Sequence, residues 1–269
     1  MKQTSKRVTF SITMLFAITM AAAQTPIDRL EQSPRHHEWV TINYGDRSVR
    51  SFLVFPEVSE KVPVVLVIHE NRGLNDWARG MADQIAEAGY IALAPDLLSG
   101  SGPNGGGTAS FANSDAARTG IYALDPDQVT ADLQANIDYA KEIASGNGKV
   151  AVIGFCWGGS QTFRLSTNTD QITAAFVCYG TGPKNEEDYQ QITAPVYGFY
   201  GGNDNRVNAT IERSKAIMDR LGKRYEPEIY DGAGHGFFRA GEAADASEAN
   251  RKAREEGWRR LKKLLAKLN

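Results

Sequence analysis

The stretch VAVIGFCWGG, residues 150–159, predicts a buried strand that runs into a tight turn and then into a helix. Gly154 and Gly158 lie two residues on either side of Cys156, where missing Cβ atoms leave room for a strained central residue. This is the spacing of a nucleophile elbow, with cysteine in place of the commoner serine. The stretch alone fits two readings: a thiol nucleophile beside half of an oxyanion hole, or a buried, inert cysteine at a strand end.

The composition is that of a globular protein without a nucleic-acid partner. A chain of 269 residues can bury a full core, and we expect residues 24–269 to form one α/β domain. The formal charge of −2 argues against nucleic-acid binding. The two cysteines cannot build a disulfide framework. Cys178 falls in a predicted buried strand and is expected in the core, and a bridge to Cys156 would demand specific geometry.

The first 23 residues have the three parts of a secretory signal peptide. Lys2, Lys6 and Arg7 precede the mostly apolar run 8–20, and residues 21–23 are alanines that fit a cleavage site. The run is short for a membrane-spanning helix, and an uncleaved anchor is the alternative. We therefore expect export to the periplasm or the medium. The mature chain, without a membrane span, would carry 27 basic and 32 acidic residues, a net charge of −5.

Apolar runs that alternate with amphipathic segments predict a mostly parallel, doubly wound sheet with helices on both faces. Strands are expected at 62–69, 91–98, 150–155, 172–179, 195–200 and 225–230, and helices at 74–88, 127–144, 160–165, 209–221 and 246–268. Residues 38–44 and 48–55 alternate apolar and polar side chains around Gly45 and Asp46, which predicts an N-terminal antiparallel hairpin.

Residues 99–118 interrupt this alternation. The segment is rich in Gly, Ser and Asn and shows no periodicity before Ala116, so we expect a mobile rim or lid, with the loop 99–113 as its main part. The triple glycine 105–107 lacks the Gly-Lys-Ser/Thr that would follow in a phosphate-binding loop.

Metal or cofactor binding is not indicated by the histidines. His36 and His37 are adjacent, but nothing downstream supplies further ligands at a fitting spacing. We expect both side chains to be solvated, and we expect the protein to need no metal and no cofactor.

Four reactive residues follow predicted strands: Glu70, Cys156, Asp204 and His235. The carboxyl ends of parallel strands meet at one edge of a sheet, so these side chains are expected to lie together. The chain order of nucleophile, acid and histidine is that of the α/β-hydrolase fold. Asp204 or His235 alone could be an ordinary turn residue, but their joint placement predicts a Cys-His-Asp triad.

Four motifs together resemble the dienelactone hydrolase (carboxymethylenebutenolidase) family: HENxG at 69–73, GFCWGG at 154–159, GGND at 201–204 and GHGF at 234–237. The resemblance extends from about residue 38 to the last helix. It implies that Cys156 is the nucleophile, His235 the base and Asp204 the carboxylate that orients it.

The same resemblance implies roles for the neighbours of the triad. The backbone N–H groups of Trp157 and Asn71 would form the oxyanion hole, and Glu70 would take part in activating the thiol. A carboxylate would repel an emerging thiolate, so Glu70 must be protonated, turned towards an arginine or acting as a proton acceptor.

Substrate recognition is implied at two arginines. Arg239, four residues after His235, matches a family arginine that binds the carboxylate of the dienelactone, and Arg118 is the candidate for a second. The Gly-rich loop 99–113 and the signal peptide depart from the compact cytosolic members, which leaves the substrate open.

The expected activity is hydrolysis of a small-molecule ester or lactone through a thioester acyl-enzyme. Within the same class, a broader carboxylesterase or thioesterase is the alternative. From other classes, the alternatives are a non-catalytic binding protein of the same fold and an exported thiol that responds to oxidants.

Overall fold

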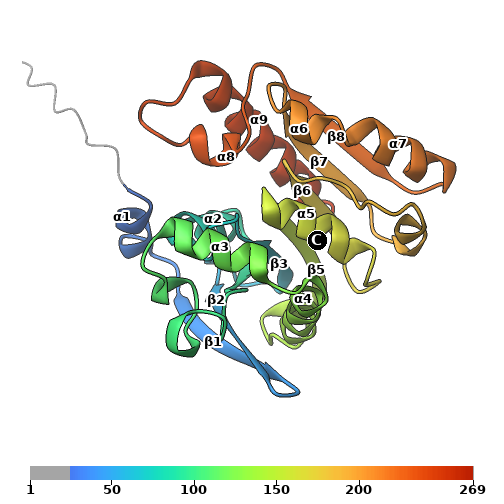
Figure 1. Cartoon of the computed structure of the whole chain (residues 1–269). Helices are drawn as coiled ribbons and strands as arrows, with labels where there is room; N and C mark the ends of the chain where they lie inside the picture. Colours follow the sequence, from blue (N-terminus) through green and yellow to red (C-terminus); the bar gives the residue numbers. More distant parts are fainter. Residues whose placement is uncertain (1–24, 269) are drawn as a thin grey trace, which may run out of the picture.

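The computed structural model describes residues 25–268, so the predicted signal peptide lies outside the described residues (Figure 1). Within these residues, eight strands form one sheet in the order β1-β2-β4-β3-β5-β6-β7-β8. They span His37–Tyr44 (β1), Arg47–Val54 (β2), Val62–Ile68 (β3), Ile91–Pro95 (β4), Gly146–Phe155 (β5), Ala174–Cys178 (β6), Val196–Gly201 (β7) and Tyr225–Tyr230 (β8). In Figure 1 the blue hairpin lies at one end of the sheet and the orange strand β8 at the other.

The sheet is parallel from β4 to β8, as the apolar runs predict. Strands β3, β4 and β6 are buried along their whole length because helices cover both faces. The β1–β2 hairpin is antiparallel and joins the sheet through an antiparallel pairing of β2 with β4. Strand β5 pairs with both β3 and β6, which places the elbow at the centre of the sheet.

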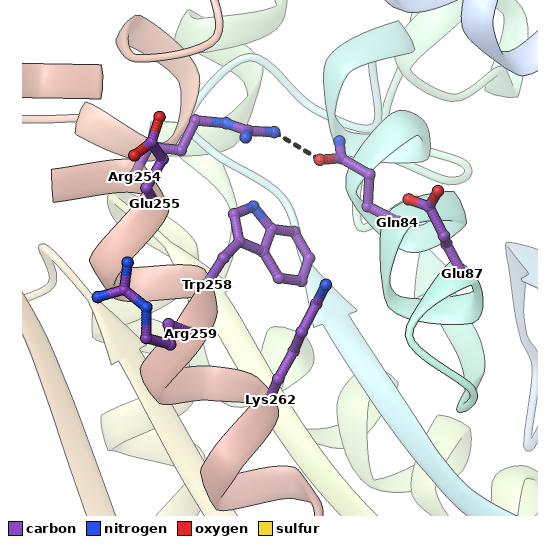
Figure 2. Close-up of a pocket in the computed structure, with 7 residues that line it drawn as sticks. All are labelled: Gln84, Glu87, Arg254, Glu255, Trp258, Arg259 and Lys262. Carbon is purple, nitrogen blue, oxygen red and sulfur yellow. Dashed lines mark hydrogen bonds between the residues drawn. The ribbon is translucent and has the colours of Figure 1, made fainter. Parts of the chain in front are cut away.

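Two layers of helices enclose the sheet. Helices α2 (Asp76–Glu87) and α9 (Glu248–Leu265) pack on one face, with Met81 and Leu261 in the same apolar cluster. Helices α4 (Pro126–Lys141), α5 (Trp157–Ser166) and α7 (Ile211–Arg220) contribute to the cluster on the other face. Figure 2 shows α9 beside α2, where the Arg254 guanidinium donates to Gln84 Oε1 at 2.5 Å.

The segment predicted as an aperiodic rim contains regular structure. Helix α3 (Ser114–Ala123) begins at the N-cap Asn113, and two 3₁₀ turns precede it at Pro103–Gly105 and Thr108–Ser110. The α3 pattern is weak because only Ala117 and Ile121 are buried. The structure also contains three short helices that were not predicted: α1 (Pro26–Glu31), α6 (Asn205–Asn208) and α8 (Phe237–Ala240).

The expectation that His37 is solvated is wrong. Its Nε2 lies 2.8 Å from Oδ1 of Asp83, a buried carboxylate on α2. Arg35 and Ser33 bind the same carboxylate at 2.7 Å and 2.6 Å. This cluster joins the segment before β1 to α2, a long-range contact that local sequence does not reveal. His36 is exposed, as expected.

No helix within residues 25–268 is both long enough and apolar enough to cross a bilayer.

Candidate active site

The elbow has the strained backbone that its glycines predict. Cys156 joins β5 to α5 with φ 56° and ψ −113°, a conformation that non-glycine residues rarely adopt. A Cβ at Gly158 would lie 2.3 Å from the carbonyl oxygen of His69, and one at Gly154 would lie 2.1 Å from that of Gly158. The helix can therefore start directly against β3 and β5 only if these positions have no side chain.

The structure brings Cys156, His235 and Asp204 into one hydrogen-bonded line. His235 Nε2 lies 3.1 Å from Cys156 Sγ, and His235 Nδ1 lies 2.5 Å from Asp204 Oδ2. Asp204 follows β7 and is buried, while His235 follows β8 and is partly exposed. A carboxylate at Nδ1 favours the tautomer with its proton there, which leaves Nε2 free to accept the thiol proton.

Glu70, which follows β3, is turned towards an arginine. Its Oε2 accepts a hydrogen bond from Arg239 Nε at 2.8 Å, and the Tyr179 hydroxyl lies 3.5 Å from Oε1. Of the three states that the sequence left open for this carboxylate, the structure therefore shows the one paired with a cation. Arg239 comes from α8, whose start at Gly236 needs the left-handed φ of 76°.

The thiol of Cys156 has a higher pKa than the thiol of an ordinary cysteine. Burial raises its pKa, and the charge of Glu70 raises it further. The backbone N–H of Trp157 and the charges of Arg206 and Arg239 act in the opposite direction without reversing the shift. The resting site therefore holds a thiol that needs a nearby base, and His235 is within reach of it.

The two predicted oxyanion donors lie on segments that His69 holds in place. His69 Nδ1 is 2.8 Å from the Glu70 carbonyl oxygen, and the Leu97 N–H lies 3.3 Å from Nε2. The imidazole stacks on the Trp157 ring with 5.6 Å between centroids. Asn71 donates through its side chain to the Tyr122 hydroxyl at 3.1 Å. The backbone N–H of Trp157 acts on Cys156 by lowering the pKa of its thiol.

A cavity of about 130 Å³ opens beside the thiol, and its lining differs from the one predicted. It contains Arg206, from α6, which the sequence interpretation overlooked. The signal was its position two residues after Asp204, where a short helix follows β7. Tyr122 of α3 is another lining residue without a sequence expectation.

The two predicted substrate arginines do not line this cavity. Arg118 is exposed on α3 and pairs with Asp115 at 3.4 Å. Arg118 lies one helical turn before Tyr122. Arg239 is held by Glu70 as described above.

Other features of the described chain are separate from the triad. Residues 25–268 contain no cluster of three or more histidine, cysteine or acidic side chains that could hold a metal. Cys156 and Cys178 are both free thiols, and Cys178 is buried in β6 as expected. A groove of about 430 Å³ between α2 and α9 contains no residue of the triad (Figure 2).

The family model and the curated relatives that match this chain point to the same family. A sequence model of the dienelactone hydrolase family matches residues 49–269. A protein from Escherichia coli K12 with the provisional name carboxymethylenebutenolidase is 32% identical over 74% of this chain and 75% of its own length. One with the same provisional name from Methylorubrum extorquens is 29% identical over 82% of this chain and 78% of its own length.

Solved structures agree on the fold. A provisionally named dienelactone hydrolase from Klebsiella pneumoniae superposes with a TM-score of 0.74 at 24% identity, covering 86% of this chain and 98% of its own. The dienelactone hydrolase-like promiscuous phosphotriesterase P91, from metagenomic libraries, superposes with a TM-score of 0.73 at 25% identity, covering 87% of this chain and 98% of its own. The mixed sheet with flanking helices is thus an α/β-hydrolase fold.

Proposed function

This chain belongs to the dienelactone hydrolase family and is a hydrolase of ester or lactone bonds, and from that premise we propose that Cys156, His235 and Asp204 perform the hydrolysis through a thioester. The observation that carries the proposal is the contact of 3.1 Å between His235 Nε2 and the thiol sulfur. A histidine at that distance can take the proton as the sulfur attacks, so the raised thiol pKa does not prevent reaction.

Acylation begins when His235 accepts the thiol proton and the sulfur attacks the carbonyl carbon of the ester or lactone. The resulting oxyanion is stabilised by the backbone N–H groups of Trp157 and Asn71, and loss of one such donor typically lowers the rate by about 10²–10³. The tetrahedral intermediate then collapses, the C–O bond breaks, and the departing alkoxide takes the proton from His235. For a lactone, the released alcohol stays attached to the acyl group.

Deacylation reverses the roles. His235 accepts a proton from water, whose oxygen attacks the thioester carbonyl, and the second tetrahedral intermediate expels the Cys156 thiolate. The thiolate regains the proton from His235, and the product leaves as a carboxylic acid. Asp204 holds the imidazole in place during both steps through its contact with Nδ1.

Substrates with an anionic group fit the charges around the thiol. Arg206 lines the cavity, and no carboxylate of the described residues lies within ion-pair distance of it. Arg239 is next to the site and becomes available to a ligand if Glu70 releases it. Arg118 shares a face of α3 with the cavity residue Tyr122, since four residues separate them. We propose Arg239 and Arg118 as carboxylate ligands, with Arg206 as a third.

The sequence pattern is the basis for the proposed location of the protein and for its proposed domain organisation. We propose that residues 1–23 direct export and are removed, and that residues 24–269 form one catalytic domain.

A substrate panel tests this function. The purified mature chain, kept reduced, is assayed with a dienelactone, a neutral aryl ester and an acyl thioester, and kcat/KM is compared. We expect the lactone or the ester to be hydrolysed and Cys156→Ala to abolish the reaction while the fold persists. Turnover of the thioester alone favours the thioesterase alternative. No turnover of any acyl substrate contradicts the proposed mechanism and favours a binding protein or an oxidant-responsive thiol.

A further inference from the structure

A second cavity, of about 610 Å³, lies over the β1–β2 hairpin and is lined by none of the triad residues. Its floor is one face of the hairpin, its first wall is the start of α2, and its second wall is the loop that follows β4. The hairpin extends past the rest of the sheet because β2 pairs with β4 only from Ser51 to Val54 (Figure 1). The cavity uses the part of the hairpin face that α2 leaves uncovered.

The floor combines an aromatic ring and a cation. In the register of the hairpin, Thr41 lies opposite Arg50 and Trp39 opposite Phe52, so all four side chains share one face. Phe52 is buried under α2, whereas Trp39 keeps 39% of its surface exposed. The Arg50 guanidinium lies 4.4 Å from the centre of the Trp39 ring. Contact of this kind restrains the guanidinium, and no described side chain accepts a hydrogen bond from its N–H groups.

Arg50 has no anionic partner in the described part of the chain: no carboxylate of residues 25–268 lies within ion-pair distance of it. The other arginine of the cavity, Arg79, is already paired with Asp76 at 2.5 Å. One cation without an ion-pair partner among the described residues therefore lines the cavity beside a half-exposed indole.

The second wall of the cavity, the loop after β4, is held in place by hydrogen bonds to Asp96. The Asp96 carboxylate accepts hydrogen bonds from the N–H and the hydroxyl of Thr108, both at 2.7 Å, and from the Leu98 N–H at 3.1 Å. A Cβ at Gly107 would lie 2.3 Å from Asp96 Oδ2, so only glycine fits there. Because three donors satisfy Asp96, its negative charge is screened from a ligand.

We propose that this cavity binds a small organic carboxylate with a flat, apolar body. The carboxylate would accept paired hydrogen bonds from Arg50, whose planar fork matches it. The ring or chain of the ligand would lie against Trp39 and Leu74, the two largest apolar side chains of the cavity. A single free cation suits a singly charged group with an apolar body better than a phosphate. The site does not depend on the activity at Cys156.

Benzoate is the probe, and its binding is followed by the indole N–H resonance of Trp39 in NMR spectra. That resonance is assigned by its loss in Trp39→Phe. The mature protein is first alkylated at Cys156 with iodoacetamide, so that the catalytic cavity is blocked. Benzamide, a neutral isostere, and inorganic phosphate, an anion without an apolar body, are titrated in parallel.

We expect benzoate to shift the Trp39 resonance in a saturable way, equally with and without alkylation. Arg50→Ala should weaken binding by about tenfold or more, because a charge-assisted pair is lost. Arg50→Lys keeps the charge but loses the fork, and binding should be intermediate. Arg224→Ala is the matched control, since Arg224 also stacks on an aromatic ring, Tyr197, at 5.4 Å, and it should leave binding unchanged.

Four results would overturn the proposal. These are loss of the benzoate response after alkylation, equal responses to benzoate and benzamide, a response to phosphate as strong as that to benzoate, and unchanged affinity in a folded Arg50→Ala protein.

Discussion

Glu70 Oε2 lies 2.8 Å from Arg239 Nε, so the carboxylate beside the candidate nucleophile is held by a cation from a different strand end. This ion pair joins the loop after β3 to helix α8. It also leaves a negative charge close enough to Cys156 to raise the pKa of its thiol, in addition to the effect of burial. A raised pKa lowers the fraction of thiolate, which is the reactive form of the side chain.

Glu70→Gln should lower the pKa of Cys156, because the change removes a repulsive charge while the charges of Arg206 and Arg239 remain. The rate of alkylation by iodoacetamide, measured against pH, should shift to lower pH. At a fixed pH below the thiol pKa the rate rises by up to about tenfold for each unit by which the pKa falls.

Removing a positive charge near Cys156 should raise the pKa of its thiol. Arg206→Ala removes a charge that favours the thiolate, so the same alkylation profile should move to higher pH. Glu212→Gln, an exposed carboxylate on α7, is the control and should leave the profile in place. Profiles of Glu70→Gln and Arg206→Ala that shift in the same direction would contradict this account of the electrostatics.

Gly158→Ala should disrupt the elbow, because its Cβ would meet the carbonyl oxygens of His69 and Ile68 at 2.3 Å and 2.5 Å. Overpacking of this kind costs about 1–3 kcal/mol, occasionally more. Gly80→Ala, on α2, is the matched change, since nothing lies within 4 Å of its Cβ. It should stabilise the protein by up to about 1 kcal/mol. Thermal unfolding measures both effects, and equal melting temperatures would show that the approach at Gly158 is not tight.

Arg239→Ala should raise KM for anionic lactones by about tenfold, because one charge-assisted contact to the substrate is lost. For neutral aryl esters KM should change little. Steady-state kinetics on both substrates gives the comparison, with Arg224→Ala as an exposed-arginine control. A uniform loss on both substrates would indicate that Arg239 acts only by holding Glu70.

Asp83→Asn should destabilise the protein by about 3 kcal/mol, the low end for breaking a buried ion pair. Burial opposes ionisation of this carboxyl, but hydrogen bonds from Arg35, Ser33 and His37 hold its pKa below the usual value. Its contribution is therefore fully present above the ordinary aspartate pKa, near 4, and is lost as pH falls further. Urea unfolding from pH 7 to pH 3 should show a steeper loss of stability in the unmodified protein than in Asp83→Asn; parallel curves would contradict the role of Asp83.

The elbow and the sheet were predictable because their signals are local. Gly154 and Gly158 specify a turn that only small residues allow, and uninterrupted apolar runs such as 62–68 specify strands covered on both faces. Since the carboxyl ends of parallel strands lie at one edge of a sheet, the predicted strands were enough to bring Cys156, Asp204 and His235 together.

The remaining features leave no local signal in the sequence. Helix α3 has a largely exposed surface, so its sequence lacks the periodic apolar stripe of a packed helix. The partner of His37 is Asp83, 46 residues later in the chain. Arg206 resembles any exposed arginine until α6 is placed beside the thiol. For His37 and Arg206 the deciding neighbour is far away in sequence, whereas α3 was missed because it is exposed.

In the proposed mechanism Cys156 carries the acyl group. Mass spectrometry detects that group directly when the mature enzyme is quenched in acid during turnover of an aryl acetate and digested with protease. We expect an acetyl thioester on the peptide that contains Cys156, and we expect no such group in Cys156→Ala. An acetyl group on Cys178 instead, or full turnover by Cys156→Ala, would contradict it.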